Sequence, residues 1–290
     1  MLIITQTALE LGFLYALVAM ALFLSYRILD IADMTTDGCF VLGAAVSVSL
    51  TAAGHPILAI PAAMLAGACA GFATAFLQTR LGVPSILAGI VTNTGLYTVN
   101  LMTMGWKANQ SLLGGSTIFT LLRDTGIGGD WYELLLAAAV TILAGVLLLA
   151  FLGTRIGLSI RATGDNPDMV RASSINTAFT VTVGLCVANA LTALSGAVLA
   201  QYQRTADINL GTGMVIIGLA SLIIGDTLTP KGRVHTKILG ALAGSVIYRF
   251  IIAIALRLDL PSECLKLISA VIVALAIGLP ALGGEKKGVA

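Results

Sequence analysis

Polar side chains that could hydrogen-bond a small solute lie inside otherwise apolar runs of this sequence. Asn93, Tyr97 and Asn100 are spaced by four and three residues, so on a helix they share one face. Asn189 and Thr192 form a weaker pair of the same kind. Because polar groups are costly in an apolar solvent and persist mainly where they face a cavity or a partner, we expect these five side chains to line a path for a polar solute. The alternative is hydrogen bonding between neighbouring helices, which uses the same residue types.

Patterns for catalysis and metal binding do not occur in the sequence. It has no GxxxxGK[ST] phosphate-binding loop, no HExxH motif, no nucleophile elbow and no cluster of carboxylates with histidine. His55 and His235 are isolated, and the four cysteines are scattered without a CxxC pair. We therefore expect no catalytic residue, no metal site and no ATP-binding site in this chain.

The elements that carry the polar residues are long stretches without charge. No charged side chain lies between Gly38 and Thr79. Charged residues make up 10% of the chain, whereas a soluble domain has about 25%. A run of about 18 apolar residues is already a candidate membrane span. The sequence therefore predicts an all-α, polytopic integral membrane protein, in which residues 1–290 form a single transmembrane domain.

Nine transmembrane helices, within a range of eight to ten, fit the apolar runs and the turn residues between them. Gly54 and Pro56 divide the longest charge-free stretch into two helices, and Gly82 and Pro84 separate the third helix from the fourth. The expected helices cover residues 8–26, 36–53, 56–79, 84–104, 131–152, 177–201, 212–228, 238–256 and 265–282.

The distribution of basic residues predicts the orientation of these helices. With the N-terminus outside, ten Lys and Arg residues fall on the cytoplasmic side and five on the opposite side. This ratio favours an outside N-terminus by the positive-inside rule. Arg249 is the one charge that we expect clearly inside a span, with its side chain reaching toward the membrane surface. The net charge of +2 gives no clustered basic face for nucleic acid.

Other residues of the spans are expected to serve the structure. Two GxxxG motifs, at residues 67–71 and 240–244, place pairs of glycines on one helix face and predict close helix packing. Their comparable places in the two halves of the chain suggest an internal duplication. Asp37 is expected to cap the second helix with its neighbouring threonines, and Asp226 to lie at a helix end.

The polar segment 154–176, between the fifth and sixth expected spans, has the signals of a short exposed helix. Gly164 permits a tight bend, Asn166 is a good N-cap, and Pro167 suits the first helical position. Asp168 complements the positive end of the helix that follows. A solvated loop that only fixes the topology is the alternative. Small and basic side chains complete a surface on which another protein could dock: Ala172, Ser173, Ser174, Arg161 and Arg171.

This 154–176 segment resembles the coupling helix of the membrane subunits of ABC importers for branched-chain amino acids and for ribose-type sugars. The family pattern is G-x-x-x-R-A-x-G-x-N-x-x-x-A-x-x-x-G-I-N. The residues that match it are Gly157, Arg161, Ala162, Gly164, Asn166, Ile175 and Asn176. Val170 takes the place of the usual alanine, and Ser174 that of the usual glycine.

The resemblance extends over about residues 10–280. Residues 12–20 resemble the first span of the family, residues 81–89 its entry to the central helix, and residues 218–225 the run before its second glycine-rich loop. Residues 26–38 depart from the usual ending of the amino-acid permeases and resemble a branch associated with aromatic amino acids such as tryptophan or tyrosine.

The resemblance implies a type II permease subunit of an ATP-driven importer in the bacterial cell membrane, forming a homodimer with the path between its subunits. The expected partners are two copies of a separate ATP-binding subunit, which would hold ATP and Mg²⁺, and an external substrate-binding protein or lipoprotein. The residues expected to engage the ATP-binding subunit are Arg161, Gly164, Asn166, Pro167, Asp168, Met169, Arg171, Ser174, Ile175 and Asn176.

The expected cargo is a small polar nutrient, an aromatic or branched-chain amino acid. Two alternatives stay open at this point. One is an ABC permease for a sugar, and the other is an ion-coupled secondary transporter, a class that usually places ionisable groups at the middle of the membrane.

Overall fold

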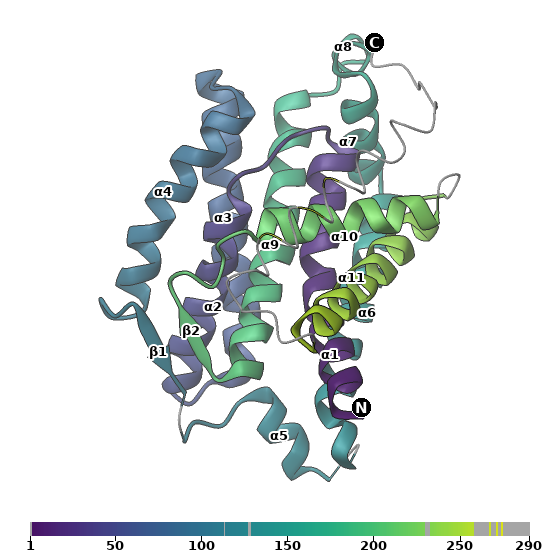
Figure 1. Cartoon of the computed structure of the whole chain (residues 1–290). Coiled ribbons are helices and arrows are strands. Elements are labelled where there is room, and N and C mark those ends of the chain that lie inside the picture. The colour runs from purple at the N-terminus through teal and green to yellow at the C-terminus, as the bar shows by residue number, and fades with distance from the viewer. Residues whose placement is uncertain are drawn as a thin grey trace.

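The computed structural model describes residues 2–112, 114–126, 129–229 and 233–257, together with Leu267, Val271 and Ala274. Over these residues the chain is a bundle of helices (Figure 1). The helices are α1 (Leu2–Leu22), a π-helix (Phe23–Ile28), α2 (Thr36–Ala52), α3 (Pro56–Leu81), α4 (Ser85–Thr103), α5 (Ile118–Asp124), a 3-10 helix (Gly129–Trp131), α6 (Tyr132–Gly153), α7 (Arg155–Asp165), α8 (Pro167–Ala172), α9 (Thr177–Gln203), α10 (Met214–Leu228) and α11 (Val234–Arg257). The two strands, β1 (Asn109–Ser111) and β2 (Thr205–Asp207), pair antiparallel with Gln110 opposite Ala206.

The described residues confirm an all-α, polytopic membrane fold. Helices form at eight of the nine expected places, and the ninth, residues 265–282, lies almost entirely outside the described residues. Five of the described helices are long and apolar enough to cross a membrane. They are Thr5–Ile28, Pro56–Leu81, Tyr132–Gly153, Thr177–Gln203 and Val234–Ala255.

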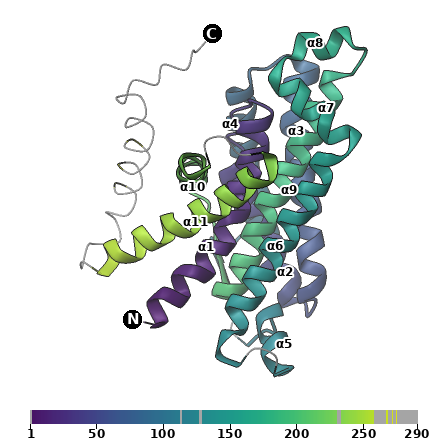
Figure 2. The same ribbon diagram turned by 90° about the vertical axis from the view of Figure 1, so that its right-hand side faces the viewer.

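Two of the helices, α2 and α10, are too short for a full crossing. They contain 17 and 15 residues, which at 1.5 Å per residue is about 25 and 22 Å, against a hydrocarbon layer of about 30 Å. Figure 1 shows α10 lengthwise across the bundle, and Figure 2, turned by 90°, shows it end-on. Each follows a non-helical stretch, 29–35 or 208–213, in which buried and exposed residues alternate.

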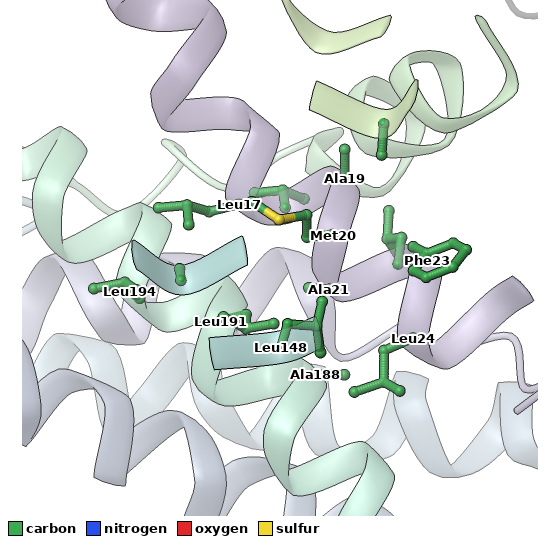
Figure 3. Close-up of a cluster of buried hydrophobic side chains, with 14 of the residues drawn as sticks. Leu17, Ala19, Met20, Ala21, Phe23, Leu24, Leu148, Ala188, Leu191 and Leu194 are labelled. Atoms are coloured by element: carbon green, nitrogen blue, oxygen red, sulfur yellow. The ribbon is translucent and has the colours of Figure 1, made fainter. Parts of the chain in front are cut away.

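The second half of α1 and the start of the π-helix form the centre of the core. Every residue from Leu14 to Leu24 is buried. A helix that is apolar on all sides is typical of a protein core or of a membrane span, and this stretch is covered by neighbouring helices on every side. Figure 3 shows the side chains that meet there from α1, the π-helix, α6 and α9, namely Leu17, Ala19, Met20, Ala21, Phe23, Leu24, Leu148, Ala188, Leu191 and Leu194.

Glycines let the helices approach one another at backbone distance. A Cβ atom at Gly67 would overlap the backbone oxygen of Asn189 on α9, and a Cβ at Gly244 would overlap that of Ser221 on α10. A Cβ atom at Gly71 would likewise overlap the backbone oxygen of Leu185, and a Cβ at Gly240 that of Gly225. The prediction that both GxxxG motifs serve close helix packing is therefore confirmed.

The two ends of the bundle carry different elements. In Figure 1, α7 and α8 lie at the upper end, and α5, β1 and β2 lie at the lower end. Asp226, in the last turns of α10, accepts a hydrogen bond from Lys237 Nζ at 2.7 Å and lies 3.5 Å from Arg27 Nε. The expected place of Asp226 near a helix end is confirmed, and its ion pairs join α10 to α11 and to the π-helix.

Candidate functional site

A pocket with several polar side chains lies between α4, the first turns of α2 and the 208–212 stretch that precedes α10. Its volume is about 390 Å³, which is within the range of pockets that bind small molecules. We call it the α4 pocket; its lining residues are Asp37, Gly38, Val41, Asn93, Thr94, Tyr97, Asn100, Ile208, Asn209, Gly211 and Thr212. The shared helix face expected for Asn93, Tyr97 and Asn100 thus contributes to one pocket, and their role in a solute path stays a prediction.

Asn100 is the most buried polar side chain of the α4 pocket. It is 1% exposed, and its Nδ2 donates a hydrogen bond to the carbonyl oxygen of Gly38 at 3.1 Å. This contact fixes the orientation of the amide, because a carbonyl oxygen can only accept. Asn100 Oδ1 is then left without a hydrogen-bond partner among the described residues. Asn93 also packs on Gly38, where a Cβ atom would overlap Asn93 Oδ1.

Asp37 caps α10 and does not cap its own helix. Its Oδ2 accepts a hydrogen bond from the backbone N–H of Gly213 at 3.0 Å, and its Oδ1 accepts one from that of Val215 at 2.9 Å. Just before α2, Asp33 Oδ1 accepts from the N–H of Thr35 at 2.8 Å, and Thr35, the N-cap residue of α2, makes no side-chain capping bond. The predicted cap of the second helix by Asp37 is therefore wrong, because the carboxylate reaches a helix end 176 residues away.

Asn189 and Thr192 do not line the α4 pocket. Asn189 is 1% exposed and donates to Asp33 Oδ2 at 2.7 Å and to the carbonyl oxygen of Leu185 at 3.1 Å. Thr192, also buried, donates to the carbonyl oxygen of Ala188 at 3.2 Å. The structure thus brings together three of the five polar side chains that the sequence singled out.

Buried charges inside the bundle are more numerous than the sequence analysis expected. Glu10 is 2% exposed and accepts from Tyr202 Oη at 2.7 Å, and Asp33 is 4% exposed. Arg249 does not extend away from the helices, because its guanidinium lies 3.5 Å from the ring centroid of Tyr15 in a cation–π contact. The expectation of Arg249 as the one charge inside a span is wrong. The signal for Glu10 was present, since it lies inside the expected helix 8–26.

The helix start predicted in the 154–176 segment is confirmed. Asn166 Oδ1 accepts hydrogen bonds from the backbone N–H groups of Asp168 and Met169, at 3.1 and 3.0 Å. Pro167 is the first residue of α8, and Arg171 lies 3.4 Å from the carboxylate of Asp168. Since these signals act between close neighbours in the sequence, they could be recognised without the tertiary structure.

One face of α8 packs against the rest of the bundle, and the opposite face is exposed. Val170 is 1% exposed, whereas Met169 is 54% and Ile175 is 36% exposed. Arg161, on α7, is half-buried, and Asn176 caps α9 by accepting from the N–H of Phe179. Exposed apolar side chains among charges at one end of the bundle suit a surface that binds another protein.

Gly164 has a different role from the one expected. It lies within α7 rather than at a bend, and a Cβ atom there would overlap the carbonyl oxygen of Ile28, at the end of the π-helix. The left-handed backbone of the segment occurs at Ser174, with φ of +62°. Ser174 is the position at which the family pattern has glycine.

We expect Ser174→Gly to stabilise the protein by up to about 1 kcal/mol. A left-handed conformation costs an L-residue about 1–2 kcal/mol, and part of this gain is lost to the greater freedom of glycine in the unfolded chain. Thermal unfolding of the purified protein measures the difference. Ser173→Gly is the matched control, since Ser173 has φ of −84° and its substitution should destabilise. Equal destabilisation by both variants would contradict the argument.

Long apolar helices, two partial helices whose first turns meet, and a polar pocket at that meeting point define a multi-pass membrane protein of the permease class. The chain matches the family described as the permease component of branched-chain amino acid transport systems over residues 4–277, and it belongs to this family.

Three relatives illustrate the range of the family. The chain is 35% identical to a tyrosine transport system permease protein of Clostridioides difficile, over 89% of this chain and 85% of that one. It is 30% identical to the autoinducer 2 import system permease protein LsrC of Salmonella paratyphi B, over 74% and 60%. It is 24% identical to the ribose import permease protein RbsC of Haemophilus influenzae, over 88% and 78%. No solved structure matches the chain.

Proposed function

We propose that this chain is the membrane-spanning subunit of an ATP-driven importer that takes up an amino acid, aromatic or branched-chain. The observation that carries the proposal is the exposed, capped α8 on a bundle with a polar pocket, in a chain whose sequence lacks an ATP-binding loop. Such a subunit supplies no catalytic group. It converts a movement of its partners into a movement of helices around a solute.

The cargo is argued from the relatives and from the composition of the pocket. A relative named for tyrosine transport covers most of both chains, which supports an aromatic amino acid. Relatives named for ribose and autoinducer 2 keep a sugar-like cargo as the second candidate. The side chains of the α4 pocket are mainly neutral and polar, and such groups can hydrogen-bond either kind of solute.

The exposed α8 at one end of the bundle and the α4 pocket support the proposed partner proteins. Two ATP-binding subunits, which hold ATP and Mg²⁺, would dock on the 154–176 segment at one end of the bundle. A substrate-binding protein or lipoprotein would deliver the solute at the opposite end, where β1, β2 and α5 lie. A second copy of this permease would complete the path.

The decisive experiment is uptake of radiolabelled L-tyrosine and L-leucine by proteoliposomes that contain the permease with its ATP-binding subunit and its binding protein. We expect uptake only when ATP is present in the compartment of the ATP-binding subunit. Uptake that persists without ATP and without that subunit would instead support an ion-coupled secondary transporter. Uptake of ribose in place of both amino acids would support the sugar alternative.

Asn166→Ala is expected to reduce both uptake and transport-linked ATP hydrolysis about fivefold, with little change in folded protein. Removal of an N-cap costs about 1 kcal/mol, which disfavours the docking form of α8 by that factor. Asn166→Asp is the matched control, because aspartate keeps an acceptor oxygen at the same position. The assays are ATP hydrolysis and uptake in the same proteoliposomes. Full activity of Asn166→Ala would count against a docking role for α8.

A further inference from the structure

We propose that the α4 pocket selects its solute by a positively charged, hydrogen-bond-donating group, and that Asn100 Oδ1 accepts from that group. For an amino acid the group is the α-ammonium. This inference rests on the proposed function for the identity of the cargo, and it adds which end of the cargo the pocket recognises. In Figure 1, α4 and α2 lie on the left of the bundle, and α10 runs across the bundle toward the right.

The first argument is the unused acceptor. Asn100 lines the α4 pocket and is 1% exposed, yet its Oδ1 has no hydrogen-bond partner among the described residues. The amide cannot be flipped by 180° to give Oδ1 a partner, because Nδ2 already donates a hydrogen bond to the carbonyl oxygen of Gly38. A buried acceptor without a partner is costly, so a donor supplied by the solute gains more here than it would at the surface.

The second argument concerns the helix ends. In transporters with interrupted helices, the positive N-terminal ends often face the carboxylate of the substrate. Here the start of α10 is already satisfied by a carboxylate of the chain itself. Asp37 accepts from the N–H groups of Gly213 and Val215 at this helix end. The start of α10 is therefore not free to bind an anionic group.

The third argument is the charge balance of the lining. Among the described residues that line the α4 pocket, none is Lys, Arg or His, and Asp37 is acidic. A lining with an acidic side chain and no basic one favours a cationic group of the solute over an anionic one. Such a lining attracts an ammonium group, and it can offer a carboxylate only neutral donors such as amide and hydroxyl groups.

The test compares three compounds that share one ring and differ only in their charged ends: L-tyrosine, tyramine, and 3-(4-hydroxyphenyl)propionate. Binding to the full-length permease in detergent is measured by the shift of its thermal unfolding temperature over a range of concentrations. We expect half-saturation by tyramine and by L-tyrosine at concentrations about tenfold or more below that of the propionate, because a site built around a hydrogen bond rejects the analogue that lacks it. Equal binding of the amine and the acid, or no shift with any of the three, would overturn the proposal.

A pair of variants assigns the preference to Asn100. Asn100→Ala should bring the half-saturation concentrations of amine and acid toward one another. Asn189→Ala is the matched control, since Asn189 is equally buried and also has an Oδ1 without a partner among the described residues, but does not line the α4 pocket. The readout is a ratio within each variant, so a general loss of stability does not imitate the result. A ratio unchanged in Asn100→Ala would overturn the role of Asn100.

Failure of this inference can be told apart from failure of the proposed function. The binding assay needs neither ATP nor a partner protein. If uptake is driven by ATP while amine and acid bind alike, the proposed function stands and the inference fails. If the amine is preferred while uptake is independent of ATP, the selectivity stands and the proposed energy source fails.

Discussion

Gly43→Ala is expected to destabilise the protein by about 3 kcal/mol, because overpacking of a tight contact costs about 1–3 kcal/mol and more where nothing can yield. A Cβ atom at Gly43 of α2 would overlap the carbonyl oxygen, the carbonyl carbon and the Cα atom of Ala193 on α9. These are backbone atoms, so no flexible side chain can move aside. The measurement is the yield of monodisperse protein and its thermal unfolding temperature in detergent.

Gly95→Ala is the matched control for this prediction. Gly95 lies within α4, and a Cβ atom there would meet no other atom within 4 Å. Since alanine is the better helix former by about 0.5–1 kcal/mol, Gly95→Ala should leave stability unchanged or slightly raised. If Gly43→Ala were as stable as Gly95→Ala, the close approach of α2 and α9 would not be a feature of the folded protein.

The second large effect is expected for Asp37→Ala, at about 3 kcal/mol or more. The substitution leaves the N–H groups of Gly213 and Val215 without acceptors inside the bundle, and each hydrogen bond to a charged group contributes about 1.5–3 kcal/mol. Without this contact the start of α10 is no longer held beside α2 at the α4 pocket. We therefore expect loss of uptake together with a lower unfolding temperature.

Two further variants calibrate the Asp37 result. Asp37→Asn keeps one acceptor oxygen and should be intermediate. Asp207→Ala is the surface counterpart, since Asp207 also accepts from a backbone N–H, that of Asn209, at an exposed site. Its loss should cost less than about 1 kcal/mol, because water replaces an exposed partner. Equal losses of stability in Asp37→Ala and Asp207→Ala would show that the contact at the start of α10 contributes no more than an exposed hydrogen bond.

Two helix starts show which kind of cap can be predicted from the sequence alone. Asn166 and Asp37 are both polar residues at the beginning of a helix, and both were interpreted as local caps. The interpretation is right for Asn166, whose acceptor meets N–H groups two and three residues ahead. It is wrong for Asp37, whose acceptors meet N–H groups of α10. A local rule cannot tell these cases apart, because it does not contain the position of a distant backbone.

The polar residues of α4 and α9 show the same division. Spacing placed Asn93, Tyr97 and Asn100 on one face, because the helical period is fixed by backbone hydrogen bonds. Spacing also predicted that Asn189 and Thr192 line a solute path. In the structure, Asn189 instead bonds Asp33 in the 29–35 stretch, and Thr192 bonds a carbonyl oxygen of its own helix, α9. Whether a polar face meets a pocket or a buried carboxylate depends on which helix lies opposite.

The sequence by itself determined the membrane environment, the family and the places of eight described helices, because a chain in lipid must satisfy its backbone hydrogen bonds within each segment. It also determined the capped helix α8, which depends on neighbours along the chain. Only the tertiary structure decided that α2 and α10 are partial helices that meet, that Asp37 of α2 caps the start of α10, and that Asn100 Oδ1 has no hydrogen-bond partner among the described residues. Those features are contacts between segments far apart in sequence, and their energy depends on packing that no local pattern encodes.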